Sequence, residues 1–278
     1  VDGLAHKWML ALCFFVLSLT FLMAAGLFFR AWPVLASQNL GKLLFSTVWH
    51  PTQGHFGLAT FIVSTIWVTA IAMIIAVPLS ILTAIYLAEY APGRLRDFLR
   101  PVIDLLAGIS PVIFGVFGLL VIVPYTGFSA LSAGIVLAIM VFPIIISIVE
   151  EVLLTVPAEI REAALSLGAT KWEAVKLAVL RKAQPGIIAA IILGLSRAFG
   201  ETMAVLMVAG CSLHSFPHSP FDPAYPLPAL IANTYGEMMS IPLYDAAVLF
   251  AAFILFLATV AFNMAGWGIL IKNIRREA

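Results

Sequence analysis

Arg197, Glu201 and Thr202 are the residues of this sequence that most clearly suggest chemistry. They lie in the stretch GLSRAFGETMAV, residues 194–205, inside a long apolar run. An arginine at the centre of a bilayer costs about 2.5–3.5 kcal/mol on insertion scales, so ionisable residues at such positions are functional candidates. The guanidinium offers a planar fork of donors that matches phosphate oxygens and stays charged at any relevant pH. One interpretation of this pattern is therefore a path for an anion.

Two interpretations of this charged pair stay open. Glu201 follows Arg197 by four residues, so on a continuous helix both side chains share one face. In a structural interpretation they neutralise each other and help to pack the helices. In a functional interpretation Arg197 lines the anion path, while Glu201 holds the guanidinium and keeps the anion from binding too tightly. Thr202 could offer its hydroxyl to the anion, and a bond back to its own helix is an equally good alternative.

The composition excludes a soluble globular domain. The chain has 278 residues, of which 63% are hydrophobic and 10% are charged. Soluble domains are typically about 45–50% apolar and about 25% charged. Two cysteines, Cys13 and Cys211, give no indication of the compartment. We expect one bundled membrane domain over residues 1–278, with its core at about 60–271.

Six segments are long and apolar enough to cross a bilayer. A spanning helix needs about 20 apolar residues, and open strands cannot satisfy their backbone hydrogen bonds in lipid. The sequence therefore predicts an all-α polytopic membrane protein with six transmembrane helices and Arg197 near the midplane of the fifth. Pro78, Pro111 and Pro143 predict kinks within three of these helices. The six segments are Trp8–Phe29, Thr60–Leu87, Val102–Val123, Leu131–Val149, Gly186–Val208 and Tyr244–Ile271.

The distribution of basic residues predicts the orientation of these helices. Of the 15 Lys and Arg residues, 12 fall before the first segment, in the second and fourth loops or after the last segment. Basic residues are enriched in cytoplasmic loops. We therefore expect a multi-pass protein of the cell inner membrane with both termini in the cytoplasm. On the opposite side, the loop at 209–243 contains no Lys or Arg and is rich in proline.

The cytoplasmic loop at 150–185 is the only long polar helical stretch. Pro157 and the acidic residues after it are typical of a helix start. Gly168 then interrupts the run, and Thr170 with Glu173 three residues later forms a capping-box pattern. The sequence predicts a helix, a glycine turn and a second helix. Its small exposed residues suit docking into another protein, and an amphipathic connector on the bilayer surface is the alternative.

Part of this loop resembles a known family. The stretch EAALSLGA, residues 162–169, is similar to the EAA loop of importer permeases of the ATP-binding-cassette class. The matching residues are Glu162, Ala163, Ala164 and Gly168, whereas Arg181 stands where the family usually has proline. The resemblance implies that this helix seats in a cleft of a separate ATPase subunit and transmits its motion.

Two further stretches resemble the phosphate-specific branch of these permeases. DLLAGISPVIFGVFGLLV, residues 104–121, is similar to the start of the third helix, with Ser110 and Pro111 in exchanged order. GLSRAFGETMAV resembles the fifth helix, and is closer to the C subunit than to the A subunit because of Met203 and Ala204. The resemblance extends from about residue 60 onward. It implies the type I importer permease fold and a place for Arg197 on the substrate path.

Asp104 and Ser110 are candidates for gating residues. Asp104 lies near the cytoplasmic end of the third segment, and Ser110 follows within the same segment. The alternative for Asp104 is a solvated carboxylate or one paired with a nearby arginine. The alternative for Ser110 is a hydrogen bond that packs helices. We expect no catalytic residue and no metal site, since no nucleophile or ligand cluster assembles in the spans.

The resemblance also implies partners. The sequence contains no G-x-x-x-x-G-K-[ST] phosphate loop, so we expect ATP to be bound by a partner and no cofactor by this chain. Implied partners are a homologous second permease subunit, two copies of an ATP-binding-cassette ATPase and an extracytoplasmic phosphate-binding protein, with membrane lipid around them and no nucleic acid.

Two other functions remain as alternatives. One is an importer permease for another oxyanion, such as sulfate or molybdate. The other is a secondary carrier driven by ions, with Arg197 and Glu201 as its coupling pair. Such carriers often contain inverted repeats, and none is evident in this sequence. Dependence of uptake on ATP distinguishes the two classes.

Overall fold

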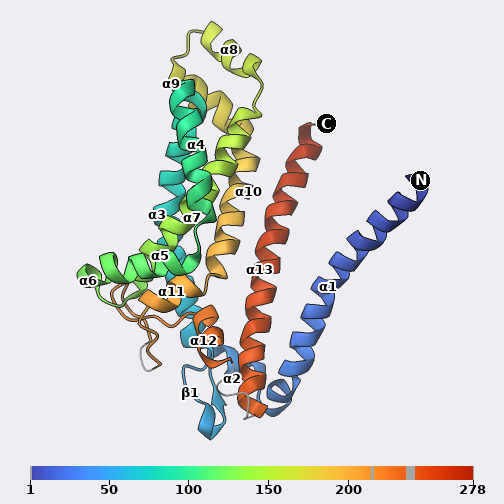
Figure 1. The fold of residues 1–278 in the computed structure, drawn as a ribbon, viewed down its shortest axis with the longest axis vertical. Coiled ribbons are helices and arrows are strands. Elements are labelled where there is room, and N and C mark those ends of the chain that lie inside the picture. Colours follow the sequence, from blue (N-terminus) through green and yellow to red (C-terminus); the bar gives the residue numbers. More distant parts are fainter. Residues whose placement is uncertain (1, 214–215, 236–241, 278) are drawn as a thin grey trace. The chain divides into compact units, whose positions relative to one another are not determined.

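The computed structural model describes residues 2–213, 216–235 and 242–277 (Figure 1). It divides into two compact units: Val1–Thr60 with Leu230–Leu257, and Phe61–Ala229 with Ala258–Ala278. Two long helices, α3 (Ala59–Ile85) and α13 (Pro242–Glu277), have residues in both units.

The first unit is mostly helical. The aromatic rings of Phe28 and Phe253 lie 5.7 Å apart between α1 (Asp2–Ser37) and α13. Nη2 of Arg30 lies 3.3 Å from Oδ2 of Asp245 along the same pair of helices. After α1, this unit continues with α2 (Leu40–Phe45), β1 (Trp49–His50), the 3-10 turn η1 (Pro51–Gln53) and β2 (His55–Phe56). Strands β1 and β2 pair antiparallel.

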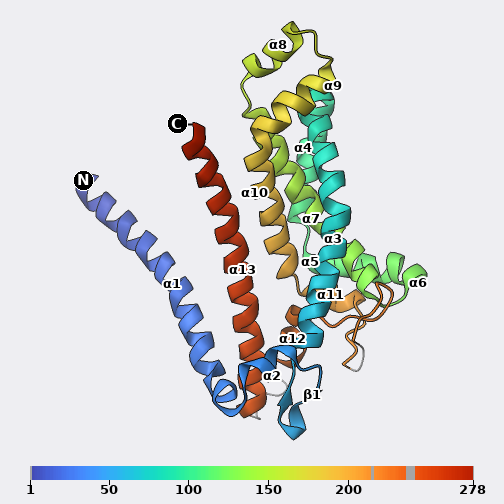
Figure 2. The ribbon, with the colours of Figure 1, turned by 180° about the vertical axis from the view of Figure 1, so that it is seen from behind.

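The second unit is a helical bundle. Figure 2 shows α3, α4, α7 and α10 running along one another, with α8 and α9 at one end and α5, α6 and α11 toward the other. Its elements after α3 are η2 (Tyr86–Tyr90), α4 (Gly93–Gly108), α5 (Pro111–Phe117), η3 (Gly118–Ile122), α6 (Val123–Thr126), α7 (Ala130–Leu154), α8 (Ala158–Ser166), α9 (Lys171–Ala174), η4 (Val175–Val179), α10 (Leu180–Phe199), α11 (Met203–Val208) and α12 (Leu227–Thr234), which continues into the first unit.

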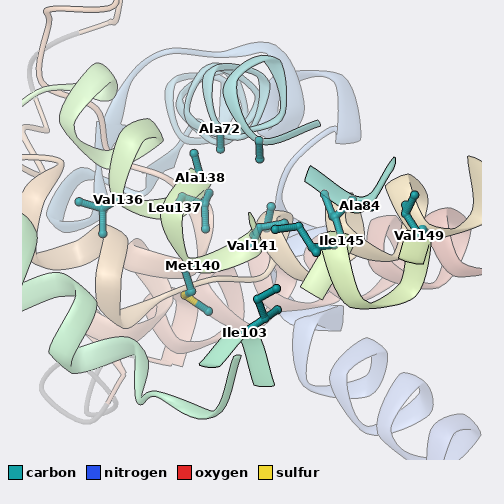
Figure 3. Packing of buried hydrophobic residues seen from close by; sticks show 14 of the residues in the cluster. Ala72, Ala84, Ile103, Val136, Leu137, Ala138, Met140, Val141, Ile145 and Val149 are labelled. Atoms are coloured by element: carbon teal, nitrogen blue, oxygen red, sulfur yellow. The ribbon is translucent and has the colours of Figure 1, made fainter. Parts of the chain in front are cut away.

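Helix α7 is the centre of this bundle. Its buried side chains, including Leu137, Val141 and Ile145, meet Ala72 and Ala84 of α3 (Figure 3). Ile103 of α4 joins the same cluster. A helix that is apolar on all sides is a buried helix, and the sequence of α7 has that pattern.

Glycines allow neighbouring helices to approach α7 closely. A Cβ placed on Gly134 of α7 would lie 2.5 Å from Ile71 of α3, and one on Gly194 of α10 would lie 2.8 Å from Ile145. A Cβ on Gly118 would lie 2.4 Å from Val136. Small residues at helix contacts are typical of membrane bundles, where packing replaces the hydrophobic effect.

The count of membrane helices agrees with the prediction of six when a bent pair is taken as one span. Among the described residues, five helical runs are long and apolar enough to cross a bilayer, and α4 with α5–α6 qualifies as a bent pair. The five runs are His6–Ser37, Ala59–Tyr90, Ala130–Leu154, Lys171–Phe199 and Pro242–Ile269.

The third predicted helix is broken rather than kinked. Helix α4 ends at Gly108 and α5 begins at Pro111, and the helical stretch Pro111–Thr126 is bent by 92° from the axis of α4. Ser110 between them is extended, with φ −62° and ψ 137°. A residue before proline avoids the α region, and proline favours the first position of a new helix. The interpretation of Pro111 as a kink inside Val102–Val123 was therefore wrong.

The fifth predicted helix is also not continuous over Gly186–Val208. Helix α10 ends at Phe199, and α11 begins only at Met203. The run that α10 completes begins at Lys171, well before the predicted start. Glycine is a poor helix former, and Gly200 is the residue at which the helix stops.

The loop at 209–243 is partly ordered by backbone hydrogen bonds. The amide of Ala224 donates to the carbonyl of Ala209 at 2.9 Å, and that of Cys211 donates to Ala224 at 3.2 Å. The amide of Ala130, at the start of α7, donates to Asp222 at 2.9 Å. Residues 214–215 and 236–241 of this loop lie outside the described residues.

Candidate functional site

Arg197 lies in the last turn of α10, at the break before α11. A cation in the last turn of a helix is favoured by the helix dipole, because the terminal carbonyls carry partial negative charge. The amide of Gly200 donates to the carbonyl of Arg197 at 3.3 Å, and that of Glu201 donates to Ala198 at 3.3 Å. Glu201 thus follows the helix end, so the prediction that Arg197 and Glu201 share one face of a continuous helix was wrong.

The side chains of this break are only partly covered within the chain. Arg197 is exposed, whereas Glu201 and Thr202 are half-buried. Among the described residues, no carboxylate forms an ion pair with the Arg197 guanidinium. The mutual neutralisation of the structural interpretation is therefore absent from this part of the chain. The Thr202 hydroxyl donates to the carbonyl of Gly200 at 3.3 Å, which is the local bond named as its alternative.

The end of α10 is held by α13. The side-chain amide of Asn263 donates to the hydroxyl of Ser196 at 2.8 Å, and the rings of Phe199 and Phe262 meet edge to face at 5.3 Å. A Cβ on Gly266 would lie 3.1 Å from Ile192 of α10. These contacts fix the turn that carries Arg197, although no local sequence pattern relates residues this far apart in the chain.

Glu201 lines a small pocket that Arg197 does not reach. Thr65 and Thr69 of α3 lie on its wall together with Pro226 and Pro228. The Thr65 hydroxyl is already engaged, since it donates to Phe61 at 2.7 Å and accepts from the amide of Leu227 at 2.9 Å. Thr65 and Thr69 escaped the sequence analysis because hydroxyls in an apolar helix are common and usually bond within it.

The two proposed gating residues lie in different places. Asp104 faces an open pocket between α4 and α7, which Asp97, Arg100, Pro101, Ser147 and Glu151 also line. Ser110 is at the α4–α5 bend, outside that pocket. Neither of them lines the pocket of Glu201.

A buried carboxylate next to this open pocket was not anticipated. Glu150 of α7 is 2% exposed, and its Oε1 lies 3.7 Å from Nε of Arg100. Among the described residues, that oxygen accepts no hydrogen bond. Within the part of the chain that the structure describes, no group of three or more His, Cys, Asp or Glu side chains is placed to hold a metal ion.

Helix α8 carries Glu162, Ala163 and Ala164, and it has no buried residue. It is followed by Gly168 with φ +85°, a left-handed conformation that glycine adopts without strain. The second helix begins with the predicted capping box, in which Glu173 and Thr170 bond each other's backbone. The predicted helix, glycine turn and helix are confirmed, and the second helix continues through η4 into α10.

The apolar side chains at the tip of α8 are uncovered within this chain. Leu165 is 48% exposed and Leu167 is 90% exposed. Singly exposed leucines are common on protein surfaces, so these two side chains leave α8 uncovered but do not by themselves mark an interface.

The chain was compared with known proteins. A family model described as binding-protein-dependent transport system inner membrane component matches residues 76–267. The phosphate transport system permease protein PstC of Xylella fastidiosa (strain 9a5c) is 40% identical over 263 residues, covering 85% of this chain and 80% of that protein. The probable phosphate transport system permease protein PstC of Methanocaldococcus jannaschii is 32% identical, covering 91% of this chain and 88% of that protein.

The fold is similar to that of a solved transporter chain. A chain from inward-facing conformations of the MetNI methionine ABC transporter superposes with a TM-score of 0.64. The alignment covers 81% of this chain and 99% of that chain, at 18% sequence identity. This likeness shows that the two chains share a fold.

Proposed function

Because the chain belongs to the family of binding-protein-dependent transport system inner membrane components, we propose that it is the permease subunit of an ATP-driven importer of inorganic phosphate. The observation that carries the substrate is the 40% identity, over 85% of this chain, to a permease named for phosphate transport. The chain supplies part of the translocation path, and a partner ATPase hydrolyses the nucleotide.

Arg197 contacts or steers the anion in this proposal. An exposed guanidinium without an ion-pair partner among the described residues is expensive against lipid. Either water or a second protein chain must therefore lie against this face of α10. A homologous permease subunit that faces this chain across an aqueous path provides both the water and the second chain. Glu201 and Thr202 lie at the same helix break as Arg197. Phosphate oxygens match the donor geometry of arginine.

Helix α8 couples the permease to the ATPase in this proposal. Its small residues Ala163, which is exposed, and Ala164, which is half-buried, allow close approach of another surface, and Leu167 offers an uncovered apolar contact. Residues Glu162 to Gly168 would seat in the ATPase, with two ATPase copies serving two permease subunits. This arrangement places α8 and both termini in the cytoplasm, as the distribution of basic residues predicts.

On the opposite side, an extracytoplasmic binding protein delivers phosphate to the surface that includes the loop at 209–243. Asp104 and Ser110 remain proposed gating positions. In this proposal Asp104 acts from the open pocket beside α4, and Ser110 acts at the α4–α5 bend, where a change of the bend angle would move α5.

Transport by the reconstituted complex tests the proposal. The chain is co-expressed with a second permease and the ATPase, placed in vesicles, and supplied with binding protein and radiolabelled phosphate. We expect uptake that requires ATP and is not displaced by excess sulfate or molybdate. Uptake of sulfate or molybdate in preference to phosphate would identify another oxyanion importer. Phosphate uptake that continues without the ATPase would identify an ion-driven carrier and contradict the proposal.

A further inference from the structure

The end of α3 is a π-helical turn, Tyr86–Tyr90, at which three cationic side chains from other elements converge. The amide of Ala91 donates to the carbonyl of Tyr86 at 2.8 Å and closes this turn. A π-helical turn inside a helix inserts one extra residue and is frequent at functional sites. We call residues 86–90 the π turn.

Arg161 of α8 makes the strongest of these contacts. Its Nη2 and Nε donate to Oε1 of Glu89 at 2.7 and 2.9 Å, which is a fork-like contact on a carboxylate that is 7% exposed. The same guanidinium donates to the carbonyls of Leu153 at 2.9 Å and Val156 at 2.6 Å. One side chain therefore joins α8, the end of α7 and the π turn. Only arginine has enough donors in a rigid plane to do this.

Two further cations bind the same turn. Arg96 of α4 donates to the carbonyls of Leu87 and Ala88 at 2.8 and 2.7 Å. Nζ of Lys171, at the start of α9, lies 4.5 Å from the centre of the Tyr90 ring. The elements on both sides of the glycine turn, α8 and α9, are thus connected to the end of α3, and α4 is connected to it as well.

We propose that the Arg161–Glu89 pair is a positioning contact that makes α8 and the end of α3 move as one body. This inference rests on the proposed function, in which α8 receives the motion of the ATPase. A displacement of α8 would pull on Glu89 through charge-assisted hydrogen bonds, which are stronger than neutral ones. From the π turn the displacement reaches α4 through Arg96, and therefore two of the helices that pack on α7.

The test measures how much phosphate is imported for each ATP hydrolysed by the assembled complex. We expect Arg161→Lys and Glu89→Gln to leave assembly and ATP hydrolysis near the wild-type level. The ratio of phosphate to ATP should fall at least about tenfold, which corresponds to about 1.4 kcal/mol of coupling. Arg30→Lys is the matched control, because it changes an arginine in the more exposed Arg30–Asp245 pair.

A merely structural role has a different signature. Arg161→Lys would then reduce the amount of complex, and the remaining complex would keep its ratio of phosphate to ATP, which overturns the proposal. If both variants fail to assemble, the double variant Glu89→Cys with Arg161→Cys is made in a chain without Cys13 and Cys211. A flexible thiol cross-linker then joins the two new cysteines. Restored assembly with restored import supports the contact, and restored assembly without import overturns it. If the wild-type complex imports another anion, the proposed substrate is wrong. The ratio of imported anion to hydrolysed ATP is then measured with that anion.

Discussion

A hydrogen bond between Asn263 of α13 and Ser196 of α10 joins the two helices. It lies one residue before Arg197, the arginine that is predicted to meet the anion. The Asn263 amide also donates to the carbonyl of Thr259 at 2.9 Å, so both of its donors are used. Ser196 is 7% exposed, and its neighbour Arg197 is exposed. The bond therefore fixes the rotation of the last turn of α10 through the residue directly before Arg197.

Replacing Asn263 should loosen that turn. Asn263→Leu keeps the size of the side chain and removes the bond to Ser196, so we expect the free energy of unfolding to fall by about 0.6–1.7 kcal/mol, as for hydrogen bonds between membrane helices. Phosphate uptake per assembled complex should also fall. Converted to a free energy, this loss of uptake should exceed the loss in the free energy of unfolding. Thermal unfolding in detergent and vesicle uptake measure the two effects. Met264→Leu, at a 68% exposed neighbouring position, should change neither.

Arg197→Ala should abolish phosphate uptake while the complex still assembles. The side chain makes no ion pair among the described residues, so its removal leaves no carboxylate there without a partner. Arg197→Lys keeps the charge but loses the planar fork of donors, and we expect partial uptake with weakened affinity. Uptake of radiolabelled phosphate and co-purification of the subunits measure the outcome. Full uptake by Arg197→Ala would remove this residue from the path.

The sequence predicted the class of fold because its signals are local. Apolar length, the positions of prolines and the capping pattern at Thr170 each depend on neighbouring residues, and they led to helices at nearly the observed places. The same local reasoning failed where a helix could either bend or stop. Helices that were predicted to continue stop at Gly108 and at Gly200, and Pro111 begins a new helix after the first of these stops.

The candidate site was predictable only in part for the same reason. The functional candidacy of Arg197 follows from its charge within an apolar run. Its register relative to Glu201 required knowledge of the helix end at Phe199. The contacts Arg161–Glu89 and Asn263–Ser196 join residues far apart in the chain. No periodicity or motif in a single sequence relates such residues, so only the packed structure reveals them.

Gly134 should tolerate no side chain. A Cβ there would lie 2.5 Å from Cγ2 of Ile71 and 3.4 Å from the carbonyl of Val68, so α3 would have to move away from α7. We expect Gly134→Ala to lower the free energy of unfolding by about 1–3 kcal/mol, as for overpacked cores. Gly26→Ala is the control, since its added Cβ meets no atom within 4 Å. Equal thermal stability of the two variants would show that α3 yields without strain.

Cys211 should react slowly with thiol reagents. Burial raises the pKa of its thiol to about 11 from an ordinary value of 9.0. The thiolate is the reactive form, so at pH 8 its population, and with it the rate of alkylation, should be about 100-fold below that of an ordinary thiol. The rate should rise with pH until about pH 11. Mass spectrometry of a Cys13→Ser chain measures this rate, and a plateau near pH 9 would contradict the shift.

Gly168→Ala should separate assembly of the membrane bundle from docking of the ATPase. Gly168 has φ +85°, and a Cβ there would meet no atom within 4 Å, so its effect comes from the backbone alone. A left-handed residue with a side chain costs about 1–2 kcal/mol, which should shift the turn between α8 and α9 and lower ATPase co-purification and ATP-driven uptake together. Gly93→Ala is the matched control, because Gly93 also has open space but no positive φ. Unchanged co-purification and uptake in Gly168→Ala, and also in the bulkier Gly168→Leu, would mean that α8 does not seat in the ATPase.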